Sequence, residues 1–208
     1  MRTNPDNMVF ICGQIMSGFA YSHKIMGESF YNTELAVKRL SGTVDIIPLV
    51  ISDRLFDCTQ NCKGKFVDVS GEFRRVECFE ESKRRVSLFV FAQGMALCSV
   101  PPIETNVCQL SGRICKKPVL RETPGGRIIC DLYIQVDRLN PGTDYLPCII
   151  WGRNAVYASR LDKGTRITVT GRIQSRDYTK MISETEFTIN TAYELSAIAI
   201  EVNTDEEN

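Results

Sequence analysis

Hydrophobic and polar residues alternate along several stretches of the chain, and the alternation has a period of two. Between residues 130 and 137, Cys130, Leu132, Ile134 and Val136 take every second place, with Asp, Tyr and Gln between them. The stretches 144–151 and 166–173 repeat the pattern. A period of two is typical of strands that bury one face, so the sequence predicts a protein built mainly of β-strands.

The same patterns occur twice, about 100 residues apart. The tetrapeptide DIIP at 45–48 returns as DYLP at 144–147, and the glycines Gly64 and Gly71 return as Gly164 and Gly171. A repeat at fixed spacing indicates a duplicated structural unit. We therefore predict one unit over residues 1–98 and a second over 106–200. A proline-containing linker over 99–105 joins them, and an acidic tail over 201–208 follows.

Each unit is expected to hold five strands. In the first unit we place strands at 8–16, 29–40, 44–51, 65–78 and 85–95, with an irregular segment over 53–63. In the second, Asn154 is expected to cap a short helix that ends near Gly164, and Gly171 is expected to mark a bulge. Five strands with a helix after the third is the order of a Greek-key barrel. The predicted fold is all-β, with two tandem five-stranded barrels and a short helix between strands 3 and 4 of the second.

Residues 106–191 resemble the bacterial single-stranded DNA-binding protein family and its relative, primosomal replication protein N. The stretches that carry the resemblance are 106–113, 126–134, 144–152 and 161–172. The resemblance implies OB folds that bind single-stranded DNA without catalysis, in replication, repair or recombination. It also implies four barrels in each particle, so a chain with two barrels is expected to form a homodimer.

Family members bind bases by stacking them on aromatic rings, while cationic side chains follow the phosphates. Tyr145 and Trp151 lie six residues apart on one strand, so they share a face, and the resemblance adds Tyr178. The expected cations are Arg113, Arg138, Arg172, Arg176 and Lys180 in the second unit, and Arg39 and Arg74 in the first.

Structural alternatives stay open for these residues. A lone tryptophan can cover a barrel end or fill a subunit contact, and arginines that alternate with threonines are common on solvated strand faces. In the first unit, Ile46 and Ser52 occupy the places of Tyr145 and Trp151. Neither stacks well on a base, so we expect the first unit to have a degenerate binding face and to serve assembly.

Composition narrows the function classes only slightly. The chain has 25 Lys and Arg against 25 Asp and Glu, so net charge neither supports nor excludes a polyanionic partner. Without a secretory signal pattern or a long apolar run, we expect a cytoplasmic protein with no membrane partner. Cys58 and Cys62 could supply half of a zinc site, but a closed site needs four ligands, so no metal or cofactor is expected.

No arrangement of residues in the sequence indicates catalysis, so we expect no enzyme activity. The alternative function is a primosome or conjugation accessory that acts mainly through protein–protein contacts, with replication proteins as possible partners. The zero net charge of the chain and the altered binding face of the first unit are the reasons to consider this alternative.

Overall fold

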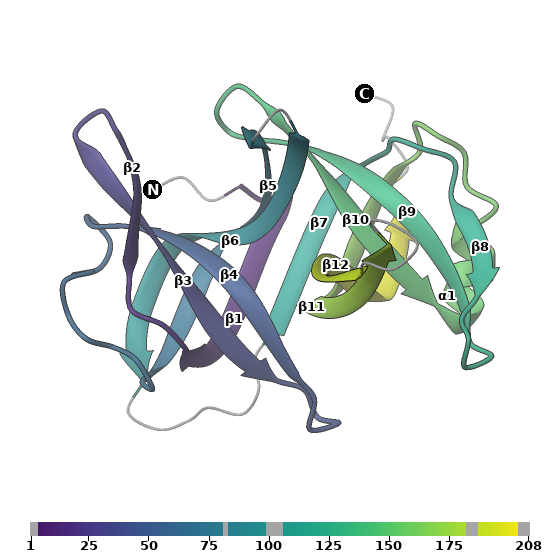
Figure 1. Cartoon of the computed structure of the whole chain (residues 1–208). Helices are drawn as coiled ribbons and strands as arrows, with labels where there is room; N and C mark the ends of the chain where they lie inside the picture. Colours follow the sequence, from purple (N-terminus) through teal and green to yellow (C-terminus); the bar gives the residue numbers. More distant parts are fainter. Residues whose placement is uncertain (1–3, 81–82, 99–105, 182–186, 204–208) are drawn as a thin grey trace.

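The computed structural model describes residues 4–80, 83–98, 106–181 and 187–203, which form twelve strands and one short helix (Figure 1). The first half contains β1 (Asn7–Ile15), β2 (Ala20–Ile25), β3 (Glu28–Lys38), β4 (Val44–Ser52), β5 (Phe66–Glu80) and β6 (Lys83–Cys98). The second half contains β7 (Asn106–Ile114), β8 (Val119–Glu122), β9 (Ile128–Asp137), β10 (Thr143–Trp151), α1 (Gly152–Ala158), β11 (Arg166–Met181) and β12 (Phe187–Val202).

Each half closes into a barrel of five strands. In the first, β1, β3, β4, β6 and β5 pair in a ring, and in the second β7, β9, β10, β12 and β11 do the same. The β4–β6 and β10–β12 pairings are parallel, and the other pairings are antiparallel. The predicted fold class, two tandem OB-fold barrels, is confirmed.

A glycine breaks the register of the fourth strand in both barrels. The β5–β6 pairing shifts at Gly71, and the β11–β12 pairing shifts at Gly171. A Cβ atom at Gly171 would collide with the carbonyl oxygen of Ser196, and one at Gly71 with that of Phe91. The bulge predicted at Gly171 is therefore present, because only a residue without a side chain allows this close backbone approach.

The secondary structure departs from the sequence prediction in three places. The short strands β2 and β8, which extend β3 and β9 as hairpins, were not predicted. Strand β12 continues through Val202, into the segment expected to be the tail. The helix begins at Gly152, not after Asn154, because Gly152 adopts φ +60° and turns the chain directly from β10 into α1, and it ends at Ala158, before the expected end near Gly164. Residues 53–63 form turns, as expected.

The two barrels meet along β1 and β7, which pair antiparallel at the centre of the molecule (Figure 1). Val9 faces Cys108, and Asn7 faces Leu110. The wall of the first barrel is therefore joined to the wall of the second at these two strands, and one continuous sheet runs through both barrels. In the described part of the chain, no helix combines the length and apolar character needed to cross a membrane.

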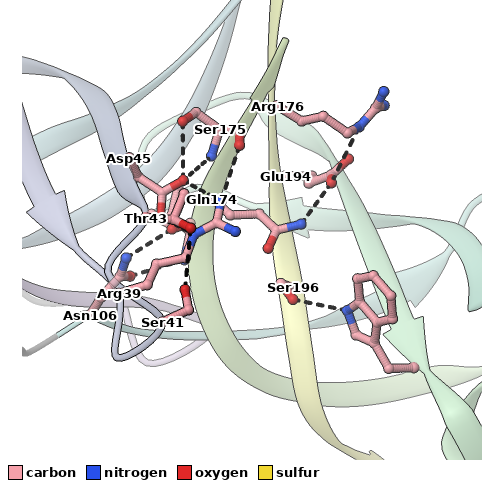
Figure 2. Close-up of polar contacts among 12 residues, drawn as sticks. Arg39, Ser41, Thr43, Asp45, Asn106, Gln174, Ser175, Arg176, Glu194 and Ser196 are labelled. Carbon is pink, nitrogen blue, oxygen red and sulfur yellow. Dashed lines mark hydrogen bonds and ion pairs between the residues drawn. The ribbon is translucent and has the colours of Figure 1, made fainter. Parts of the chain in front are cut away.

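A matched pair of ion-pair contacts flanks this junction. Arg39 binds Asp45 through two hydrogen bonds of 2.6 and 2.7 Å, and the same carboxylate accepts a bond of 2.7 Å from the backbone N–H of Ser175 in the other barrel (Figure 2). Its equivalent, Asp144, binds Arg138 in the same way and accepts a bond from Arg75 N–H across the junction. We call β1, β7 and these two contacts the seam.

The repeat detected in the sequence is therefore an internal pseudo-symmetry. Arg39 and Arg138 are 99 positions apart, as are Asp45 and Asp144, and each arginine also donates to a carbonyl oxygen of the opposite barrel. Equivalent residues on the two sides thus make equivalent contacts, as in an isologous dimer interface.

Candidate nucleic-acid interface

A groove with a cavity volume of about 550 Å³ lies on the second barrel, next to the seam. Strand β11 supplies one wall, β12 and the end of β10 supply another, and Arg39 reaches in from the first barrel. We define the groove by its lining residues: Arg39, Arg127, Trp151, Arg172, Gln174, Ser175, Arg176, Ser196, Ala197 and Ile198.

Trp151 is held in place at the end of β10. Its indole Nε1 donates a hydrogen bond of 2.9 Å to the hydroxyl of Ser196 on β12 (Figure 2). The parallel pairing of β10 with β12, in which Ile149 faces Ser196, brings these two residues together. The ring is half-buried, so its orientation at the groove is fixed by one polar contact and by the neighbouring strand.

The groove is cationic because four of its lining residues are arginines. Arg172 carries a buried Nε atom that has no hydrogen-bond partner among the described residues. Buried polar atoms in proteins are nearly always paired, so Arg172 keeps hydrogen-bonding capacity that the described residues do not use. Arg176 is half exposed and lies 3.9 Å from the carboxylate of Glu194.

One acidic group lies beside these arginines. Glu194 is buried and accepts a hydrogen bond of 2.9 Å from Gln174 (Figure 2). Burial raises the pKa of Glu194, although Gln174 and Arg176 act in the opposite direction. Its negative charge partly offsets the positive potential of the groove, and it is the side chain that holds Gln174 and Arg176 in position.

Four of the ten residues predicted for the binding face line the groove, namely Trp151, Arg172, Arg176 and Arg39. Arg39 does so while bound to Asp45, so most of its hydrogen-bonding capacity is used at the seam. The sequence prediction treated it as an outward cation, because the partner six residues later was not recognised.

The other two predicted aromatic residues lie outside the groove. Tyr145 and Tyr178 are both about 40% exposed, on β10 and β11 respectively. Tyr145 follows Asp144 and thus lies near the seam, whereas Trp151 is at the far end of β10. A strand of six residues spans about 20 Å, so a stacking role for both rings requires an extended ligand and stays a prediction.

Three other predicted cations, Arg138, Arg74 and Arg113, do not line the groove. Arg138 is bound to Asp144 at the seam, and Arg74 is bound to Glu72 and lies over the ring of Phe91. Both are committed to structural contacts within the protein. Arg113 is exposed and donates to a backbone carbonyl. Lys180 lies on β11, but its side chain is outside the described part.

Several groove residues were missed from the sequence. Arg127 directly follows Gly125 and Gly126, in the turn before β9, and nothing in its local sequence marks it as a binding residue. Ser196 and Ile198 come from β12, and no sequence pattern places that strand beside Trp151. Gln174 lies two residues from both Arg172 and Arg176 and so shares their strand face, which was the one available signal.

The equivalent surface of the first barrel has a different character. By the strand registers, the places of Arg172 and Trp151 are taken by Glu72 and Ser52. Glu72 is buried, bound to Arg74, and Ser52 donates to Glu28. A carboxylate stands where the second barrel has an arginine, so the cationic groove is present on one barrel alone among the described residues.

Comparison with known proteins finds sequence relatives of the second barrel. Residues 105–201 match the family model described as "Single-strand binding protein family". Curated relatives include Single-stranded DNA-binding protein 3 of Clostridium acetobutylicum, 36% identical over 80 residues, and the single-stranded DNA-binding protein of Clostridium tetani, 37% identical over 80 residues. Each match covers 35% of this chain and 56% or 55% of the relative, so the matched stretch spans about half of their length.

Solved structures extend the likeness to both barrels. The wild-type single-stranded DNA binding protein from Thermus aquaticus matches with a TM-score of 0.74 at 22% identity, and covers 97% of this chain and 95% of that chain. A deletion mutant of the same protein matches with a TM-score of 0.75 at 20% identity, covering 97% and 96%. At this identity the likeness shows the shared fold of two tandem barrels.

The comparisons confirm the resemblance of the second unit to the single-stranded DNA-binding protein family. They favour single-stranded DNA binding over the alternative of a primosome or conjugation accessory. The match to the family model falls on the barrel that carries the groove. The second barrel is therefore similar in sequence to the single-strand binding protein family, and the two barrels together share the fold of the Thermus aquaticus protein.

Proposed function

We propose that this protein binds single-stranded DNA, without catalysis, along the groove of the second barrel. The observation that carries the proposal is the groove in which Trp151 lies beside Arg172 and Arg176, and in which the Nε atom of Arg172 has no partner among the described residues. A phosphate can accept hydrogen bonds from the guanidinium groups of these arginines, and a base can stack on the adjacent ring.

The two contacts have different energetic roles. Stacking of a base on Trp151 contributes roughly 1–3 kcal/mol and tolerates any base, because every base has a π-face. Contacts of Arg172 and Arg176 with phosphates release counterions and make affinity fall with salt, with a slope of about −0.7 per phosphate on single strands. Two phosphate contacts thus correspond to a loss of roughly 25-fold in affinity for a tenfold rise in salt.

We further propose that the chain acts as a cytoplasmic homodimer in replication, repair or recombination, with replication proteins as possible partners. The similarity of the second barrel to the single-strand binding protein family and the two barrels in each chain support this assembly. A dimer would bring four barrels together, with the altered surface of the first barrel available for subunit contacts. Sizing with light scattering tests the dimer, which has twice the mass of the chain; a monomer at all working concentrations would contradict it.

Titration with labelled oligo-dT, followed by fluorescence anisotropy, tests the binding proposal. We expect wild-type protein to bind, Arg172→Ala to bind about ten times more weakly, and its salt slope to become shallower by about 0.7. Arg160→Ala is the matched control, because Arg160 is an exposed arginine of the same barrel that does not line the groove. Equal affinities of the two variants, or no binding by wild-type protein at low salt, would refute the proposal.

Trp151 reports on the groove directly, because it is the only tryptophan in the chain. Its fluorescence should be quenched as oligo-dT binds, and Trp151→Ala should weaken binding by roughly 1–3 kcal/mol. Full binding without a change in tryptophan emission would place the DNA elsewhere on the molecule.

A further inference from the structure

Two thiols and a carboxylate come together in the first barrel, away from the groove. Cys12 lies on β1, Asp68 on β5 and Cys98 at the end of β6. Their Sγ and carboxylate oxygen atoms all lie within 4.8 Å of one another. Cys12 is buried, Cys98 is partly buried and Asp68 is exposed, so the group has an inner and an open side.

The equivalent positions of the second barrel hold uncharged polar residues. By the strand registers, Cys12, Asp68 and Cys98 correspond to Ser111, Thr168 and Asn203. Those three residues form a hydrogen-bonded chain: the hydroxyls of Ser111 and Thr168 are 2.8 Å apart, and Asn203 bonds to Thr168 at 3.1 Å. In the second barrel, neutral polar groups therefore tie the three strands together.

In the first barrel, the same tie is made from groups that can all become anions. Burial raises the pKa of Cys12 to about 12, with Asp68 and Cys98 adding to the effect. Burial and Asp68 likewise raise the pKa of Cys98. Burial and Asp68 hinder ionisation of both thiols, and a cation bound at this point would stabilise the two thiolates.

We propose that Cys12, Asp68 and Cys98 form a zinc site. Two thiolates and a carboxylate suit Zn²⁺, with water as the fourth ligand. Tetrahedral Zn²⁺ with Zn–S bonds of ~2.3 Å and a Zn–O bond of ~2.1 Å needs donor atoms roughly 3.4–3.8 Å apart. The observed spacing within 4.8 Å permits this after small side-chain rotations.

The position of the site suggests its effect. Cys12 follows Ile11, which pairs with the first residue of β7, and Cys98 is the last residue of β6. The ion would fasten the end of β6 to β1 and β5 next to the seam. The site thus replaces, by coordination, the hydrogen-bonded tie that holds the second barrel.

Cobalt substitution tests the proposal on the full chain, with a phosphine reductant keeping the thiols reduced. One equivalent of Co²⁺ should give thiolate-to-cobalt charge-transfer absorption and the visible bands of tetrahedral cobalt, and Zn²⁺ should abolish both. Cys12→Ser, which copies the residue of the second barrel, and Asp68→Asn should weaken cobalt binding at least tenfold. Cys115→Ser is the matched control and should bind as wild-type protein does.

Thermal unfolding provides a second measurement. At a Zn²⁺ concentration about 100-fold above the wild-type Kd, the Tm of wild-type protein should rise by roughly 5–10 °C, and the rise for Cys12→Ser should be smaller by at least about 3 °C. Wild-type protein without a thiolate–cobalt spectrum would overturn the proposal. So would a spectrum that Cys12→Ser leaves intact, or one that Cys58→Ser abolishes, because the ion would then be bound by the Cys58 and Cys62 pair.

Discussion

Asp45 offers the sharpest test of how the two barrels are joined. Its side chain is fully buried, it binds Arg39 through two hydrogen bonds, and it accepts bonds from both the backbone N–H and the hydroxyl of Ser175 in the other barrel. Asp45→Ala removes all four acceptor contacts at once. Arg39, only 21% exposed, is left with a charge that has lost its partner.

The expected cost follows from that burial. Removing one member of a buried ion pair destabilises a protein by about 3–5 kcal/mol, because the remaining charge is uncompensated. This is a large part of a total stability that is about 5–15 kcal/mol for a typical protein. Arg39→Met combined with Asp45→Leu should cost less than Asp45→Ala, since no unpaired charge then remains in the seam.

Asp131→Ala is the matched control. Asp131 also binds an arginine, Arg121, but both side chains are more than a third exposed. An exposed pair of this kind contributes about 0–1 kcal/mol. The two variants remove the same kind of group from the same kind of pair, and they differ in burial and in the contact across the seam.

Urea unfolding followed by circular dichroism and by Trp151 emission would measure both variants. Wild-type protein should unfold in one transition by both probes, because the barrels share a sheet. Asp45→Ala should lower the free energy of unfolding by at least 2 kcal/mol more than Asp131→Ala does. A difference below 0.5 kcal/mol would refute the conclusion that the buried pair holds the seam together.

Further outcomes follow from single residues. Burial opposes ionisation of Asp45, but its contacts with Arg39 and Ser175 outweigh burial and lower its pKa below 3.8. The contribution of the ionised Asp45 to the free energy of unfolding is therefore complete above pH 3.8 and is lost as the pH falls through the lowered pKa. The free energy of unfolding should depend less on pH in this acid range for Asp45→Asn than for wild-type protein. Glu194→Gln should strengthen oligo-dT binding several-fold by removing a negative charge beside the groove, and should remove any rise in affinity seen in wild-type protein as pH falls through the raised pKa of Glu194. Gly171→Ala should lower the free energy of unfolding by about 1–3 kcal/mol, because the new Cβ atom would collide with the carbonyl oxygen of Ser196. Gly125→Ala is the control and should change the free energy of unfolding little, because its turn leaves room for the Cβ atom.

Local sequence patterns were enough to predict the barrels. Strand alternation depends on residues two apart, and the bulge glycines recur at fixed spacing, so both are visible without knowledge of strand order. The short strands β2 and β8 were missed because they are exposed along their whole length and carry no alternation of burial.

The candidate site was predicted only in part, since its walls come from strands distant in sequence. Trp151 meets Ser196 through a parallel pairing that no local pattern reveals. Arg39 and Arg138 were predicted to be binding residues, although each is followed six positions later by an aspartate, Asp45 in the first repeat and Asp144 in the second. That repeated spacing was a usable sign of an ion pair.

Joining two barrels in one polypeptide changes what mutation can do to them. In a pair of identical subunits, every substitution appears on both sides of the two-fold contact. Here the gene encodes the two sides separately. The arginine–aspartate contacts are the same on both sides, whereas the position of Arg172 in the second barrel is occupied by Glu72 in the first. The covalent link thus permits a division of labour, in which one copy specialises in its ligand and the other in holding the particle together.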